Sequence, residues 1–292
     1  MRISIVIPSY NRGYIIDRTL KSILNQIYQE WECIVVDDFS SDNTEEIVNL
    51  YHLQDNRIMF LRNNRLKGAQ GARNTGILAA KSDWIVLFDS DNVMHSDFLL
   101  KCADVIESNN IDVVTTWSNV IDSKTNKKIN HFMWVNNGNI YNGLLSAKCY
   151  IDNSSTVIKK SKLEEIGLLS EDCPAFQEWD THIRLSQIAI YKTIEECLID
   201  YYAGAADAIS SDQVKDVKGY VYILNKYKKE WISFSKYYFI KYASLLKYKI
   251  SLLNAEQKAL FKDSFNAIAE GYKPVINIFS KVFTIKHLIS QR

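Results

Sequence analysis

The segment "WIVLFDSDNV", residues 84–93, joins a strand pattern to a pair of carboxylates. Its first five residues are apolar, and an unbroken apolar run is typical of a strand that is buried on both faces of a parallel sheet. Asp89 and Asp91 follow at once, one residue apart. Carboxylates this close repel each other, so the pair predicts a positively charged partner at the end of this strand.

Strands of the same type recur through the first 110 residues, and a helical pattern follows each one. The predicted elements are strands over 3–7, 32–38, 57–63 and 84–88, and helices over 16 to about 29, 42–51, 68–81 and 96–110. This repeat predicts an α/β fold with a doubly wound, mostly parallel sheet and helices on both of its faces.

Two of the predicted helices carry capping signals at their N-termini. Asp42 is followed three residues later by Glu45, a spacing that predicts a capping box. Ser96 or Asp97 is the expected cap of the helix over 96–110.

Polar segments follow the four predicted strands. In a sheet of this kind, ligands bind beyond the carboxyl ends of the strands. The segments that meet this criterion are 8–11, 37–41, 64–73 and 89–91. We therefore expect the binding site along one edge of the sheet.

The remainder of the chain changes character near residue 212. Residues 111–212 continue with strand and helix patterns, whereas residues 213–292 are helical and rich in Lys, Tyr and Phe. From residue 213 onward there are 15 Lys and Arg against 5 Asp and Glu, which leaves 20 against 29 in residues 1–212. We expect one α/β domain over 1–212, with halves 1–110 and 111–212, and a basic helical tail that meets something anionic.

Cysteine usage and hydropathy bear on the cellular location. The five cysteines are scattered without a CxxC pair, which disfavours zinc or disulfide frameworks and favours a reducing cytoplasm. No apolar run approaches the ~18 residues of a membrane span, and the apolar run before Pro8 is too short for a signal peptide.

Motif spacing argues against two nucleotide-binding classes. The turn after the first strand, "PSYNRG", contains one glycine instead of the G-x-G-x-x-G fingerprint, and the chain has no Walker A loop. A divalent cation such as Mn²⁺ or Mg²⁺ on Asp89 and Asp91 would neutralise a phosphate-bearing ligand instead. The alternative for this pair is an acidic loop in which one aspartate caps the helix that begins near Ser96.

Four segments together resemble one family. They are "SIVIPSYNRGYIIDRTLKSILNQIYQEWECIVVDDFSSDNTEEIV", "GARNTGILAAKSDWIVLFDSDN", "NSSTVIKKSKLEEIG" and "FQEWDTHIRLS". In this order they resemble glycosyltransferase family two, which has the GT-A fold, over residues 2 to about 211. The tail beyond 213 lies outside the resemblance.

The resemblance implies an inverting transferase with a nucleotide-diphosphate sugar as donor, expected to be a UDP-sugar. The residues that it implies for the nucleotide are Pro8, Tyr10, Asn11, Asp38, Arg73 and Asp89. It also implies that Asp91, together with Asp89, holds Mn²⁺ or Mg²⁺ on the diphosphate. Tyr10 could instead pack over the sheet edge, and Arg73 could pair with a carboxylate there. Because alternate strand residues face opposite ways, Asp37 is expected to be structural.

The segment "FQEWDTHIRLS" departs from the family pattern. Family members commonly carry Glu-Asp-x-Asp here, with the second carboxylate as catalytic base. Gln177 stands in the place of the Glu, and Glu178 in the place of the base. Either Glu178 or Asp180 could deprotonate a hydroxyl, and we expect Glu178 to be the base because it occupies the matching position. The alternative for Asp180 is the N-cap of the following helix. His182 is expected to belong to the helix surface or core.

Acceptor and metal contacts are less constrained. Trp117, Ser155 and Trp179 are the candidate acceptor residues. Many relatives carry a histidine near the end of this domain, and the segment "DYYAGAADAISSD" has none. Tyr202, Asp207 or water would take its place at the metal.

Two other functions and two roles of the tail stay open from the sequence. The rival functions are a sugar nucleotidyltransferase and a degenerate protein that binds nucleotide sugars without turnover. The lysines and aromatics of the tail suit peripheral contact with the inner face of the cell membrane, or packing on the catalytic domain or another subunit. No nucleic-acid motif accompanies the charge. A glycan or lipid-linked acceptor in surface polysaccharide synthesis is the expectation from the family.

Overall fold

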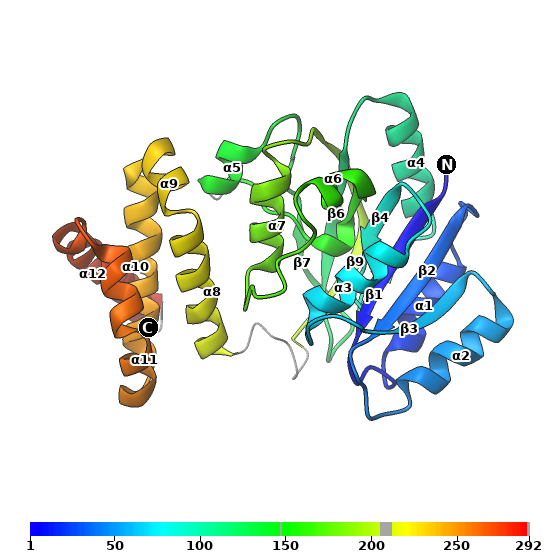
Figure 1. Ribbon diagram of the computed structural model, residues 1–292, viewed down its shortest axis with the longest axis horizontal. Coiled ribbons are helices and arrows are strands. Elements are labelled where there is room, and N and C mark those ends of the chain that lie inside the picture. Colours follow the sequence, from blue (N-terminus) through cyan, green and yellow to red (C-terminus); the bar gives the residue numbers. More distant parts are fainter. Residues whose placement is uncertain (147, 205–211, 291–292) are drawn as a thin grey trace. The chain divides into compact units, whose positions relative to one another are not determined.

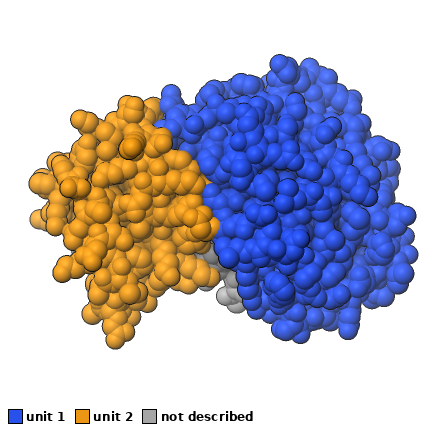
Figure 2. Space-filling model, in the orientation of Figure 1, with its two compact units in different colours: residues 1–171, 181–205 blue, residues 172–180, 206–292 orange. Residues whose placement is uncertain are grey.

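The computed structural model describes residues 1–146, 148–204 and 212–290, with side chains through Phe283. The chain forms two compact units (Figure 2). The sheet unit comprises residues 1–171 and 181–205, and the helical unit comprises residues 172–180 and 206–292.

The described part of the sheet unit contains one nine-stranded sheet (Figure 1). Its order is β3-β2-β1-β4-β8-β6-β9-β5, and β7 pairs with β6. The strands are β1 Ile3–Ser9, β2 Trp31–Asp37, β3 Ile58–Arg62, β4 Trp84–Leu87, β5 Val93–Met94, β6 Val113–Asp122, β7 Lys128–Phe132, β8 Thr156–Lys159 and β9 Tyr191–Ala203. Strands β1 to β4 are mutually parallel, β8 runs antiparallel to β4 and β6, and β9 is parallel to β6.

Helices cover both faces of the parallel strands, as the sequence predicts. The helices are α1 Ile16–Leu24, α2 Thr44–Gln54, α3 Ala69–Ala79 and α4 Phe98–Ser108. Helices α1, α2 and α4 join the core cluster that contains Ile3, Ile5 and Ile7, whereas α3 packs on β1 and β2. A Cβ at Gly76 of α3 would lie 2.3 Å from a methyl carbon of Val6, so only glycine allows this close approach.

Two predictions about helix ends are wrong. Helix α1 ends at Leu24 instead of continuing to about residue 29, and Ile27 is exposed. Helix α2 begins after Asn43 without a capping box, because the Asp42 carboxylate accepts hydrogen bonds from the backbone of Thr44 and of Gly13. One carboxylate oxygen of Asp42 is thus bonded to Gly13, in the loop that follows β1, instead of to the helix start.

The cap predicted for α4 is also not formed. Asp97 occupies the N-cap position without a capping hydrogen bond, and its carboxylate pairs instead with Lys101 at 2.7 Å. An i,i+4 ion pair thus replaces the cap at this helix start.

The rest of the sheet unit contains short helical segments. They are α5 Tyr141–Leu145, the 3₁₀ turn η1 Asn153–Ser155 and α6 Lys160–Glu165. Helix α7, Gln177–Leu185, begins in the helical unit and continues into the sheet unit.

The helical unit is built from five further helices. They are α8 Gln213–Lys226, α9 Lys228–Phe234, α10 Lys236–Leu252, α11 Ala255–Ala269 and α12 Lys273–Ser290. The structure also assigns residues 172–180 to this unit, whereas the sequence analysis places them in the α/β domain. An aromatic cluster explains the difference, since the Trp179 ring lies 5.5 Å from that of Trp231 and 5.3 Å from that of Tyr242.

Two sequence expectations can be compared with the described residues. A search of these residues finds no helix with the length and apolar character needed to cross a bilayer. All five cysteines are free, with Cys33, Cys102 and Cys173 buried and Cys149 and Cys197 half-buried.

Candidate active site

The carboxyl ends of β1 and β2 are tied together by backbone and by Asn11. Asn11 adopts a left-handed backbone with φ 51°. Its N–H donates to Ser40 Oγ at 2.8 Å, and its Oδ1 accepts from the Ser41 N–H at 2.8 Å. Pro8 is half-buried and Tyr10 is 49% exposed, so the Tyr10 ring is available at this edge.

Asp38 anchors the loop that leads into α3. Its N–H donates to the carbonyl of Ser9 at 2.8 Å, which continues the β1–β2 register. Its carboxylate accepts from Asn63 Nδ2 at 2.7 Å and from the Gly68 N–H at 2.9 Å. Gly68 stands at the N-cap of α3 with φ 131°, a conformation that favours glycine. Each carboxylate oxygen has a second lone pair, which leaves room for a further hydrogen bond to a ligand. The role of Asp38 at the base or ribose of the nucleotide stays a prediction.

Asp37 has a structural role, as the sequence analysis expects. Its side chain is fully buried, forms an ion pair with Arg62 and accepts from the Ser40 N–H at 2.9 Å. The two neighbouring aspartates therefore have different structural roles. Asp37 links β2 to β3, and Asp38 stabilises the loop before α3.

Arg73 pairs with the first aspartate of the D-x-D sequence. It lies on α3 and is 4% exposed. Its guanidinium donates to Asp89 Oδ1 at 2.6 Å and to Gln70 Oε1 at 2.8 Å. Of the two readings of Arg73, the structure contains the pair with a sheet-edge carboxylate, and contact with the nucleotide stays a prediction.

Asp91 carries a perturbed carboxyl. Burial and the nearby Asp89 charge raise the pKa of Asp91 to about 6, against the opposing effect of Arg12 and Arg18. A half-buried acidic pair that two arginines only partly neutralise favours a further cation. Carboxylate oxygens are the hard ligands that Mn²⁺ and Mg²⁺ prefer, so the residues present fit a divalent ion.

Arg18 is a residue that the sequence analysis did not identify. It lies on α1, and its guanidinium donates to the backbone carbonyl of Asp91. The guanidinium carbon also lies 3.3 Å from the centroid of the Tyr202 ring, a cation–π contact. No local signal marks Arg18, because Asp91 is 73 residues away along the chain.

Tyr202 and Asp207 were the expected substitutes for the missing histidine. Tyr202 lies at this edge of the sheet, where its N–H donates to Asn92 Oδ1 at 3.1 Å. Asp207 lies outside the described residues.

The turn η1 is hydrogen-bonded to the D-x-D loop, residues 89–92. Ser154 Oγ accepts from the Asp89 N–H at 3.1 Å and from Asn92 Nδ2 at 2.9 Å. Both Asn92 and Ser154 are fully buried. Buried hydrogen bonds of this kind hold the loop in one conformation before any ligand binds.

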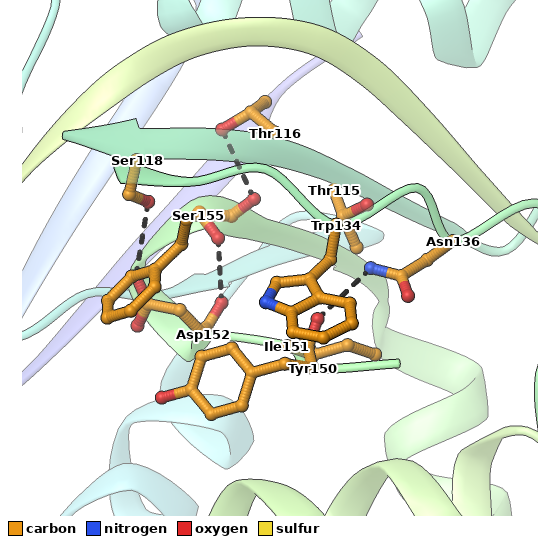
Figure 3. Close-up of a pocket in the computed structure, with 10 residues that line it drawn as sticks. Thr115, Thr116, Ser118, Trp134, Asn136, Tyr150, Ile151, Asp152 and Ser155 are labelled. Carbon is orange, nitrogen blue, oxygen red and sulfur yellow. Dashed lines mark hydrogen bonds between the residues drawn. The ribbon is translucent and has the colours of Figure 1, made fainter. Parts of the chain in front are cut away.

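A hollow adjoins this support. Figure 3 shows that the rings of Trp134 and Tyr150 lie beside polar groups from β6 and η1. Trp134 is 40% exposed and Tyr150 47% exposed. Asn136, on the wall, is 2% exposed, and its Oδ1 has no hydrogen-bond partner among the described residues. The hollow is shallow, and part of its space is open to solvent.

The structure separates the three candidate acceptor residues. Ser155 is 3% exposed and lines the hollow, with its hydroxyl donating to the carbonyl of Asp152 at 3.0 Å. Trp117 is half-buried on β6 and does not line it. Trp179 packs in the aromatic cluster of the helical unit.

The two candidate catalytic carboxylates lie in the first turn of α7. Glu178 is half-buried. Asp180 is 1% exposed, and its Oδ1 accepts from Tyr227 Oη at 2.7 Å and pairs with Lys226 Nζ at 2.6 Å. The N-cap alternative for Asp180 is wrong, because α7 begins at Gln177. The catalytic roles of both residues stay predictions.

His182 is a core residue, as expected. It is fully buried, and its Nδ1 lies 2.9 Å from Tyr191 Oη. Burial lowers the pKa of His182 to about 3, so the imidazole is neutral at physiological pH.

Four parallel strands continued by an antiparallel β8, with an acidic pair after β4, define the class of GT-A proteins. The model of the family described as "Glycosyl transferase family 2" matches residues 4–167. The chain therefore belongs to glycosyltransferase family 2, as the sequence resemblance predicts.

Curated relatives align with about two fifths of the chain. Glycosyltransferase GlyG of Streptococcus pneumoniae is 38% identical over 112 residues, which is 38% of this chain and 37% of GlyG. The Escherichia coli UDP-Glc:alpha-D-GlcNAc-diphosphoundecaprenol beta-1,3-glucosyltransferase WfgD is 39% identical over 109 residues, which is 37% of this chain and 42% of WfgD. The matches thus span less than half of these relatives.

Solved structures resemble the chain over nearly its whole length. Mannosyltransferase PcManGT from Pyrobaculum calidifontis, in complex with GDP-Man and Mn²⁺, aligns with a TM-score of 0.62 at 17% identity, over 100% of this chain and 88% of that one. Staphylococcus aureus TarS 1–349, in complex with UDP-GlcNAc, aligns with a TM-score of 0.61 at 15% identity, over 94% and 92%. At this identity the likeness establishes the GT-A fold.

Proposed function

We propose that this protein is a metal-dependent, inverting glycosyltransferase that moves a sugar from a nucleotide-diphosphate donor to a hydroxyl group. The observation that carries the proposal is the acidic pair after β4, where the Asp91 pKa is raised to about 6 beside Asp89. A site that stores uncompensated negative charge at a ligand-binding sheet edge suits a cation together with a diphosphate.

The nucleotide half of the reaction uses residues of the sheet unit. Asp91 and Asp89 would hold Mn²⁺ or Mg²⁺, which as a Lewis acid offsets the charge on the departing nucleotide diphosphate. Arg73 orients the Asp89 carboxylate through its 2.6 Å ion pair. The exposed Tyr10 ring offers a face for the base.

Glu178 is the proposed general base. Its carboxylate would take the proton from the acceptor hydroxyl, whose oxygen attacks the anomeric carbon as the bond to the diphosphate breaks. A single displacement of this type inverts the anomeric centre. Asp180 would position the first turn of α7 through its bonds to Tyr227 and Lys226.

The hollow beside η1 is the proposed site for a sugar ring of the acceptor. Exposed indole and phenol faces suit the apolar face of a pyranose, and the unpartnered Asn136 Oδ1 suits a sugar hydroxyl. WfgD is named for a UDP-Glc donor and a diphosphoundecaprenol-linked acceptor. We therefore propose a UDP-sugar donor and a glycan or lipid-linked acceptor in surface polysaccharide synthesis.

This acceptor also implies a location. A lipid-linked acceptor lies in a membrane, so we propose that the protein works in the cytoplasm at the inner face of the cell membrane. The basic tail would meet the lipid surface or a second copy of the chain.

A binding screen followed by a turnover assay tests the proposal. Thermal shifts are measured with UDP-, GDP-, CMP- and dTDP-sugars, each with and without Mn²⁺, on the wild type and on Asp91→Asn. We expect a shift that requires Mn²⁺ and a UDP-sugar and is lost in the variant. Shifts independent of Mn²⁺ would contradict the role of Asp91.

The turnover assay separates the rival functions. Release of UDP that requires an acceptor indicates transfer. Pyrophosphate released from a nucleoside triphosphate and a sugar phosphate would indicate a nucleotidyltransferase. Tight binding without turnover for any acceptor would indicate a degenerate binding protein.

A further inference from the structure

The buried side chains in the described part of α12, Lys273–Ser290, lie on one side of the helix. It runs beside α10 (Figure 1), and Ile276 and Ser280 are buried on that side. The carbonyl of Ile276 accepts from Ser244 Oγ of α10 at 3.4 Å, and Asn277 bonds to Lys247. This face supplies the contacts that α12 needs to stay folded on the unit.

A second apolar stripe lies on the outside of the same helix. Val275 is 38% exposed, Ile278 66%, Phe279 37% and Val282 47%. The spacing of three, one and three residues places these four side chains on one side of a helix. We call them the outer stripe. Exposed apolar side chains that gather in this way mark an interaction surface more often than scattered ones do.

The charge on and around the outer stripe is positive. Among its described side chains, α12 carries Lys273 and Lys281, and its sequence has no acidic residue. Lys281 is exposed next to the stripe. From residue 213 onward, basic residues outnumber acidic ones by 15 to 5. A partner of this surface must therefore accept apolar side chains and carry negative charge.

We propose that the outer stripe docks into the surface of an anionic lipid bilayer, with α12 lying in the plane of the interface. An amphipathic helix with lysines on its polar sides has this property, since its apolar side chains enter the acyl boundary while its ammonium groups meet the headgroups. This inference rests on the proposed function in one respect. A lipid-linked acceptor lies in the bilayer, so docking of α12 would bring the enzyme to its acceptor.

A second copy of the chain fits the observations less well. A stable interface buries ~800 Å² on each partner, more than four partly exposed side chains supply. A second copy would also bring an equally basic surface against the first, and like charges repel. The lipid surface satisfies both the apolar and the charge requirement.

The test measures co-sedimentation of the full chain with vesicles. One set of vesicles is phosphatidylcholine, and the other is phosphatidylcholine mixed with phosphatidylglycerol. The variants are Ile278→Ser with Phe279→Ser on the stripe, Lys281→Gln beside it, and Leu260→Ser as matched control. Leu260 is 69% exposed on α11, outside the outer stripe. All substituted side chains are at the surface, and circular dichroism checks that each variant folds.

We expect wild type to bind the anionic vesicles and the double variant to bind them at least about tenfold more weakly, because the two removed side chains supply much of the apolar contact with the acyl boundary. The control is expected to stay within about twofold of wild type, and Lys281→Gln to weaken the preference for phosphatidylglycerol. Equal binding by wild type and double variant, or no binding by either, would overturn the proposal. A dimer that the double variant loses, seen by light scattering, would overturn it in favour of a second copy.

These assays contain no nucleotide sugar, and transfer to a water-soluble acceptor is measured separately. No vesicle binding by wild type, with transfer intact, would refute the docking surface alone. Vesicle binding without any transfer would refute the proposed function alone.

Discussion

Burial and the Asp89 charge raise the pKa of Asp91 to about 6, from an ordinary value of 3.8. The folded protein therefore binds this proton more tightly than the unfolded chain does. Ionisation of Asp91 therefore destabilises the folded protein. This destabilisation is absent well below pH 3.8, where the carboxyl is protonated in both states, and it grows as the pH rises to about 6. Active sites commonly store free energy in this way, because the cost is recovered when the ligand binds.

We expect Asp91→Asn to raise the free energy of unfolding of metal-free protein near neutral pH by about 1 to 3 kcal/mol, since one pKa unit corresponds to ~1.4 kcal/mol. Urea denaturation measures the change. Asp83→Asn, at an exposed aspartate just before β4, is the control and should have no effect. A less stable Asp91→Asn protein would contradict the prediction.

His182 predicts a loss of stability in acid. Burial lowers the pKa of His182 to about 3, so below pH 6.5 the unfolded chain binds a proton that the folded chain refuses. Between pH 7 and pH 5 this residue should cost about 2 kcal/mol of unfolding free energy. The fall should be smaller by that amount in His182→Asn, which retains a polar atom near Tyr191. Exposed His131→Asn serves as control, and equal falls in wild type and His182→Asn would refute the assignment.

At the scale of elements, an ion pair between the buried Asp180 carboxylate and the partly exposed Lys226 joins the first turn of α7 to the end of α8. Asp180 Oδ1 lies 2.6 Å from Lys226 Nζ and 2.7 Å from Tyr227 Oη. Removing one member of a buried pair costs more than the pair contributes, because the remaining charge stays buried.

Lys226→Met should therefore destabilise the protein by about 3 kcal/mol, and Asp180→Asn with Lys226→Met should recover most of that loss. A double-mutant cycle in urea measures the coupling. Lys229→Met, at an exposed lysine of α9, is the matched control. A Lys226→Met protein as stable as wild type would show that the ion pair is not needed to hold α7.

At the scale of the whole molecule, the residues proposed for donor binding and for proton removal belong to different units. The D-x-D loop belongs to the sheet unit, and Glu178 belongs to the helical unit. Donor binding and proton removal should then respond to different substitutions.

We expect Glu178→Gln to lower kcat by about 10² to 10⁴, the usual contribution of a general base, with an unchanged Kd for the nucleotide sugar. Calorimetry with the donor and a UDP-release assay measure the two quantities. Glu230→Gln, also in the helical unit, is the control. A wild-type kcat in Glu178→Gln would remove this residue from the mechanism.

The sequence alone predicted the first four strands of the sheet and the edge that we propose for the site. The predicted strands 3–7, 32–38 and 57–63 differ from β1, β2 and β3 by at most two residues at either end, because unbroken apolar runs are local signals. The acidic pair Asp89 and Asp91 is also a local signal, because both residues closely follow β4 in the sequence. Helix ends were less predictable. Asp42 does not form its expected capping box, because its carboxylate accepts a hydrogen bond from Gly13, a residue of another loop.

Tertiary structure alone decided which groups surround those aspartates. Arg18 reaches Asp91 across 73 residues, Ser154 reaches Asp89 across 65, and Tyr202 reaches Asn92 across 110. No local pattern encodes such contacts, because they depend on which strands become neighbours in the sheet. Local hydrophobic periodicity thus specifies the strands and the acidic pair, whereas the raised pKa of Asp91 arises only when the sheet brings distant segments together.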